Sequence, residues 1–200
     1  KYENWVRMCE NWFNTHDAVN LILNNRYAFS GGSFWYEIFP HILFYQLVYY
    51  YAPMGRLEAI MQSTADKWLA ACLAMQGNFN WTAFNFSEMK PVFNGSWKEP
   101  DSSAGIAWLL YMAYSKWRLE CYLQGVDMAL QFLESLPPGS DSNPFYEILL
   151  PYGAYTAARI NAELGRNYDL QKLLDWCFGP STNWEVRYGW GIIAERWGDF

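Results

Sequence analysis

Carboxylates stand beside aromatic residues at four places where a helix is predicted to begin. In residues 31–37, 97–101, 142–147 and 181–185, a small polar residue, an aromatic ring and an acidic residue come together. Glycoside hydrolysis uses two carboxyl groups, one protonated as the acid and one ionised as base or nucleophile. Aromatic surroundings raise the pKa of a carboxyl by desolvation and keep it protonated. If these helix starts converge, the chain can hold such a pair.

Three of these carboxylates are our candidate catalytic residues. Glu147 is the candidate acid because aromatic residues enclose it most closely, Asp101 is the candidate base, and Glu37 is the alternative to either. Aromatic and polar neighbours would bind the sugar, the rings stacking on its apolar faces and the polar groups bonding its hydroxyls. The predicted substrate-binding residues are Trp35, Tyr36, His41, Trp97, Tyr146, Trp184 and Glu185.

Helix capping is the alternative interpretation of the same carboxylates. Acidic residues in a first helical turn bind free backbone N–H groups and complement the helix dipole. Thr182 and Glu185 have the spacing of a capping box. Capping needs no Trp beside it, however, so the repeated combination favours an aromatic cleft. The tripeptide Tyr-Glu-Ile, at residues 36–38 and again at 146–148, is the closest approach to an internal repeat.

The two histidines give no sign of a metal site. His16 and His41 occur in no zinc, nucleophile-elbow or phosphate-loop motif, so we predict neither a metal nor a cofactor. His41 follows Glu37 by one helical turn in an apolar segment, which is typical of a core histidine. In a polysaccharide lyase, Tyr36 or His41 would instead be the base that removes a sugar proton.

Hydrophobic periodicity predicts helices in most of the chain. Amphipathic segments alternate with segments that are apolar on every side, and the latter must be surrounded by protein. This alternation predicts inner helices that run in parallel and are covered by an outer layer. The predicted helices are residues 2–25, 34–51, 56–76, 104–117, 119–136, 144–164, 168–178 and 183–197. Residues 77–100 are predicted to be an irregular functional loop.

This architecture resembles the (α/α)-barrel glycan-active enzymes, which include six-hairpin glycosidases and toroid-type polysaccharide lyases. We therefore expect an all-α fold of antiparallel helical hairpins, with residues 1–200 forming one α/α-toroid domain or part of a longer barrel. A two-layer helical solenoid is the competing geometry. The resemblance implies a carbohydrate substrate, and also a further chain segment or subunit that completes the barrel.

Composition narrows the classes of partner. The net charge of −6 disfavours nucleic acid and anionic membranes, and no apolar run is long enough to span a bilayer. Aromatic residues make up 20% of the chain, including 12 Trp and 15 Tyr, which exceeds the needs of a helical core. The four cysteines lie far apart and are predicted to be buried free thiols, with one or two disulfides as the alternative. Three glycosylation sequons, at Asn80, Asn85 and Asn94, favour a secreted protein.

The sequence thus predicts a glycoside hydrolase with an acid/base pair of carboxylates in an aromatic-lined cleft. A polysaccharide lyase or a sugar isomerase on the same fold is the first alternative. A helical module that binds a glycan or a protein without catalysis is the second. Arg159 is predicted to be a structural residue paired with an acidic neighbour such as Glu163.

Overall fold

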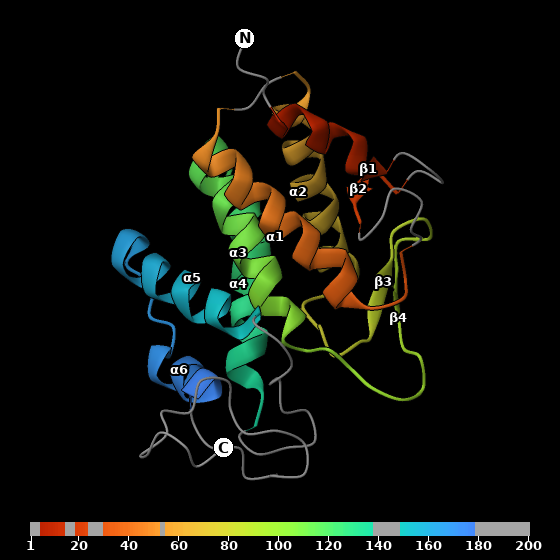
Figure 1. The fold of residues 1–200 in the computed structure, drawn as a ribbon. Coiled ribbons are helices and arrows are strands. Elements are labelled where there is room, and N and C mark those ends of the chain that lie inside the picture. The colour runs from red at the N-terminus through yellow and green to blue at the C-terminus, as the bar shows by residue number, and fades with distance from the viewer. Residues whose placement is uncertain (1–4, 15–18, 24–29, 53–54, 138–148, 179–200) are drawn as a thin grey trace, which may run out of the picture.

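A computed structural model describes residues 5–14, 19–23, 30–52, 55–137 and 149–178. This part of the chain is mostly helical, as predicted (Figure 1). Its helices are the 3-10 helix η1 (Trp5–Trp12) and the α-helices α1 (Phe34–Tyr50), α2 (Leu57–Ala74), α3 (Ser102–Trp117), α4 (Glu120–Ser135), α5 (Leu149–Leu164) and α6 (Leu170–Phe178). Two short antiparallel hairpins accompany them, β1 (Phe13–Asn14) with β2 (Leu21–Ile22) and β3 (Ala83–Asn85) with β4 (Lys90–Val92).

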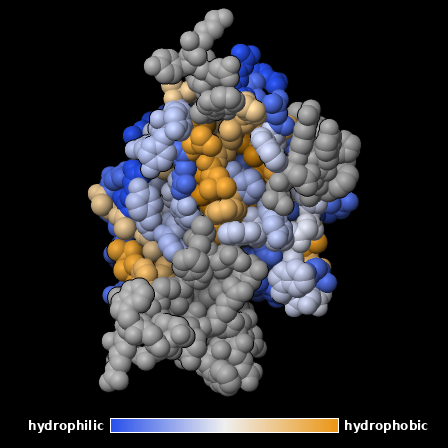
Figure 2. Space-filling model, in the orientation of Figure 1, coloured by the Kyte–Doolittle hydropathy of each residue, from blue (hydrophilic) through white to orange (hydrophobic). Residues whose placement is uncertain are grey.

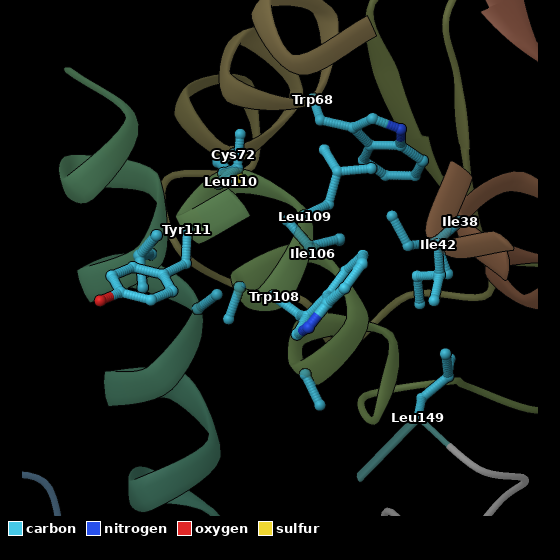
Figure 3. Packing of buried hydrophobic residues seen from close by; sticks show 14 of the residues in the cluster. Ile38, Ile42, Trp68, Cys72, Ile106, Trp108, Leu109, Leu110, Tyr111 and Leu149 are labelled. Atoms are coloured by element: carbon cyan, nitrogen blue, oxygen red, sulfur yellow. The ribbon is translucent and has the colours of Figure 1, made fainter. Parts of the chain in front are cut away.

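Helix α3 is the centre of the core. Twelve of its 16 residues are buried, and it packs against α1, α2, α4 and α5. Figure 3 shows Ile106, Leu109 and Leu110 of α3 among the buried side chains of neighbouring elements. A helix that is apolar on every side cannot face water, so the sequence of α3 accounts for its central position.

The helices form two layers. Helices α1 and α5 both contact α3, whereas α4 packs on α3, α6 packs on α5, and α2 contacts α3 and α4. The N-terminal half of α1 and the start of α5 meet α3 at the same place, since Ile38, Ile42 and Leu149 surround Gly105. The N-terminal parts of α1, α3 and α5 therefore lie close together around Gly105.

Helices α3 and α5 approach each other closely at their first turns. A Cβ atom placed on Gly153 of α5 would lie 2.8 Å from the Cβ of Ala104 and 3.3 Å from its Cα. Only a residue without a side chain fits there, because real Cβ contacts are longer. Gly153 thus sets the separation of the two helices.

A two-residue connection joins α3 to α4. Arg118 ends α3 in the left-handed conformation, with φ 56° and ψ 31°, and its backbone N–H donates to Tyr114 O at 2.8 Å. This reversal places α4 directly back along α3, which it contacts along its length.

The predicted N-terminal helix over residues 2–25 is wrong in the described part. Residues 5–12 form η1, and the following residues form the β1–β2 hairpin. The apolar residues after position 18, Val19 and Leu21–Leu23, are all buried. Such a nearly continuous run suits a buried strand better than one face of a helix.

The other predicted elements agree with the structure except at their ends. The helices expected over 34–51, 56–76, 104–117, 119–136 and 168–178 are α1, α2, α3, α4 and α6. Of the helix expected over 144–164, residues 149–164 are described and form α5, and the one expected over 183–197 lies outside the described residues. The irregular segment 77–100 contains the β3–β4 hairpin, which was not predicted. The four cysteines are free, as predicted.

No described helix has the length and apolar character needed to cross a membrane.

Candidate functional site

Glu37 lies in the first turn of α1 with its carboxylate directed at backbone. Its Oε1 accepts a hydrogen bond from Gly31 N at 2.5 Å, and its Oε2 accepts one from Phe84 N at 3.0 Å. Only 2% of the residue is exposed. Glu37 therefore ties the segment before α1 and the strand β3 to the start of the helix.

Burial raises the pKa of Glu37 to about 8, and the neighbouring charge of Glu99 acts in the same direction. The hydrogen bonds from the backbone N–H groups of Gly31, Gly32 and Phe84 oppose this shift. Such a carboxyl is protonated at neutral pH, which is the property expected of a catalytic acid. Its burial and its backbone partners nevertheless favour a structural role, although these partners, Gly31 and Phe84, lie outside α1 and the carboxylate therefore does not cap the helix.

Glu99, from the segment that precedes α3, caps the first turn of α1. Its carboxylate accepts hydrogen bonds from Ser33 Oγ at 2.8 Å, from Trp35 N at 2.9 Å and from Trp97 Nε1 at 3.0 Å. The indole N–H of Trp97 thus helps to fix the carboxylate of Glu99, although about half of Trp97 is exposed. Glu99 is not among the predicted site residues, although its place between Trp97 and Asp101 in the repeated pattern was the available signal.

The predicted residues Trp35 and Trp97 thus meet at Glu99, whose charge acts on Glu37. Asp101 precedes the first turn of α3 and is buried. Trp35 stacks on Phe39 with ring centroids 4.4 Å apart, and Tyr36 is half-exposed on α1. The predicted residues Tyr146, Glu147, Trp184 and Glu185 lie outside the described part of the chain.

His41 is a core residue in the structure. It is completely buried, its Nδ1 donates to Glu37 O at 2.7 Å, and its Nε2 accepts from Ile22 N at 3.0 Å. Burial lowers the pKa of His41 to about 3, so the ring is neutral. Both ring nitrogens form hydrogen bonds with the backbone. His41 therefore joins β2 to α1 and does not face a ligand.

Glu37→Gln tests the protonation of this buried carboxyl. An amide nitrogen cannot accept a backbone hydrogen bond, so we expect the free energy of unfolding to fall by about 1–3 kcal/mol at pH 5. The pKa of Glu37 is about 8 in the folded chain, above its ordinary value of 4.5. Its contribution to stability is therefore full below about pH 4.5 and is lost as the pH rises through 8.

Urea unfolding of both proteins between pH 4.5 and 8.5 measures this contribution. The wild-type chain should lose stability over that range, and the Gln variant should lose distinctly less. Equal pH slopes for the two proteins would show that Glu37 does not change its protonation there.

An aromatic groove lies between α1, α3 and α5, toward the other end of α1. Its volume is about 400 Å³. Five of its lining residues are aromatic, namely Tyr49, Tyr50, Trp108, Tyr152 and Tyr155. Met112 and Pro151 complete the apolar lining, and Gln46 and Arg159 are its two other polar residues. Figure 2 shows an apolar area over α1 on one face of the molecule.

Internal contacts hold the groove in shape. Gln46 Nε2 donates to Tyr152 Oη at 2.7 Å, which links α1 to α5. The rings of Trp108 and Tyr152 pack edge to face with centroids 5.3 Å apart. Arg159 lies over the ring of Tyr155 at 5.7 Å. The groove is therefore pre-formed, with ring faces and hydrogen-bonding groups side by side.

Sequence reasoning placed the cleft at the helix starts and missed this groove. The signals were present, because Tyr49 and Tyr50 belong to an unbroken tyrosine run and Tyr155 follows Tyr152 by one helical turn. The predicted pairing of Arg159 with Glu163 is confirmed by a 2.6 Å contact between Nε and Oε1. Among the described residues, no cluster of His, Cys, Asp and Glu could hold a metal ion.

Comparisons with protein-family models, with curated proteins and with solved structures found no match to this chain.

Proposed function

We propose that the chain binds carbohydrate in the groove between α1, α3 and α5. The observation that carries this proposal is the lining of the groove, in which five aromatic rings surround about 400 Å³ of space. That volume lies within the range of small-molecule sites, about 300–1,000 Å³. Tyr and Trp are amphipathic, so they offer a flat apolar face together with a hydrogen-bonding group.

A sugar ring has the complementary chemistry. Its C–H faces are apolar and can lie on the rings of Tyr49, Tyr50 and Tyr155, which are largely or half exposed. Its hydroxyl groups can bond with Gln46, Arg159 and the tyrosine hydroxyls at the edges. A purely apolar ligand would leave these polar groups without partners, which costs free energy.

We further propose that the two helical layers are part of an α/α toroid. Helices α1, α3 and α5 would be its inner layer, and the groove would then lie on the side that faces the axis of the ring. A further chain segment or a second subunit would complete the barrel.

Binding is the part of the expected activity that the geometry supports. Glycoside hydrolysis, lyase chemistry and sugar isomerisation stay predictions, because Glu37 is buried and the acid/base pair would need Asp101 and Glu147. Of the residues that line the described groove, none is a carboxylate. Secretion also stays a prediction.

Tyr155→Ala is expected to weaken oligosaccharide binding about tenfold, a typical effect of removing one well-placed aromatic contact. Tyr155 is 51% exposed, so its loss should leave stability nearly unchanged. The measurement is calorimetric titration of neutral gluco-, galacto- and manno-oligosaccharides and their uronate counterparts, with reducing-sugar release followed in parallel.

Tyr36→Ala separates the groove from the cleft expected at the helix starts. Tyr36 has a similar exposure of 54% but lies at the beginning of α1, away from the groove lining. If the Tyr36 variant loses binding and the Tyr155 variant keeps it, the binding site lies at the helix starts and not in the groove. Phe178→Ala, on α6, controls for the loss of an exposed ring. Sugar release by the wild-type chain would establish hydrolysis or lysis in addition.

A further inference from the structure

Arg159 is the positively charged residue of the groove lining, and three groups fix its guanidinium. The group lies over the rings of Tyr111 and Tyr155, at 5.0 and 5.7 Å. On its Nε side, it donates to Glu163 Oε1 at 2.6 Å. The other oxygen of Glu163, Oε2, accepts from Tyr111 Oη at 2.5 Å. The guanidinium is thus held in place before any ligand arrives.

The outer edge of this guanidinium remains available within the described chain. A guanidinium carries five N–H donors, and Glu163 uses the one on Nε. Among the described residues, no hydrogen bond or ion pair involves the two Nη atoms of Arg159. These two atoms form the flat edge that binds carboxylates with two parallel hydrogen bonds.

Local charge also favours an anion at this end of the groove. The hydrogen bonds from Arg159 and Tyr111 lower the pKa of Glu163 most, and the positive charges of Arg159 and Arg118 lower it further, so two cations stand near one carboxylate. The lining itself contains donors in Arg159, in the Tyr hydroxyls and in the Trp108 indole, and it contains no Asp or Glu. A ligand rich in acceptors fits this set better than one rich in hydroxyl donors.

We infer that the groove takes an acidic sugar, a uronate-type residue whose ring lies on the tyrosines and whose carboxylate binds the Nη edge of Arg159. The inference rests on the proposed carbohydrate binding and adds the ligand class to it. Arg159 is then the specificity-determining residue, and Glu163 with Tyr111 positions it.

Matched oligosaccharides test the inference, because they differ only in the group at C6. Oligomers of glucose, galactose and mannose are compared by calorimetry with their C6-oxidised uronate counterparts and with the methyl esters of those uronates. We expect the wild-type chain to bind one uronate oligomer about tenfold more tightly than its neutral counterpart and its ester. Added salt should reduce this preference, since it screens the charge pair.

Arg159→Gln should bring the uronate-to-neutral affinity ratio close to 1. Glu163→Gln should lower this ratio by a smaller amount, because the guanidinium of Arg159 is then no longer fixed by Glu163. Arg166→Gln is the matched control, since Arg166 forms an ion pair with Asp127 outside the groove, and it should keep the wild-type ratio. Thermal unfolding of each variant checks that it is folded.

Equal affinity of the wild-type chain for acids, esters and neutral oligomers would overturn the acidic-sugar inference and leave carbohydrate binding in place. A uronate preference that survives Arg159→Gln would overturn the role of Arg159. If no oligomer of either class binds the folded wild-type chain, the proposed function fails as well.

Discussion

Trp68→Ala is expected to lower the free energy of unfolding by about 3–5 kcal/mol, the range for truncating a buried Trp. Trp68 of α2 has no exposed surface. Its ring packs against Phe86 at 4.8 Å, His41 at 5.9 Å and Phe34 at 6.4 Å between centroids. One side chain thus joins α2 to α1 and to the β3–β4 region, and its removal leaves a cavity among all three.

Urea unfolding followed by far-ultraviolet circular dichroism measures this loss. Trp12→Ala is the control, since 47% of Trp12 is exposed and its removal should cost much less. Trp68→Phe should fall between the two because it keeps part of the ring contacts. A loss below about 1 kcal/mol for Trp68→Ala would mean that the ring is not packed as the structure has it.

Gly153→Leu is expected to destabilise the chain by about 3 kcal/mol or more, at the upper end of overpacking effects. The added Cβ alone would lie 2.8 Å from the Cβ of Ala104, 3.2 Å from Leu133 Cδ1 and 3.3 Å from the Cα of Ala104. Backbone cannot turn away as a long side chain can, so α5 must move off α3. Because both helices line the groove, oligosaccharide binding should fall as well.

Ala162→Leu is the matched control on the same helix, since Ala162 is exposed. It should change the free energy of unfolding by less than about 0.5 kcal/mol. Gly153→Ala should show an intermediate loss, because the gain in helix propensity of about 1 kcal/mol offsets part of the clash. Wild-type stability in Gly153→Leu would contradict the close packing of α3 against α5.

The helices could be predicted because their signals are local. The apolar residues of α3 occupy every side of the helix, and this alone required a central place in the core. The start of α4 followed from an amphipathic stripe that includes Tyr122, Val126 and Leu130, all of them buried. Near the N-terminus, local periodicity misled us, because Ile22 is held by a hydrogen bond to His41 in another element.

The candidate site was harder to predict because its residues meet only through tertiary packing. Burial in the fold, which the sequence alone does not define, raises the pKa of Glu37. The sequence could not show that Phe84 N, 47 residues further on, would occupy that carboxyl. Likewise, the groove depends on contacts such as that between Gln46 and Tyr152 across 106 residues.

The wide separation in sequence of the residues that line the groove has a consequence for biosynthesis. Helices α3 and α4 are joined by two residues and can pair as soon as both have left the ribosome, since closing a short loop costs little entropy. The walls of the groove come from residues 46–50, 108–112 and 151–159, so the last wall is made after most of the chain. Until then, the tyrosines of α1 have no α5 opposite them. A nascent chain arrested before residue 149 would hence carry the α3–α4 hairpin without the third wall of the groove.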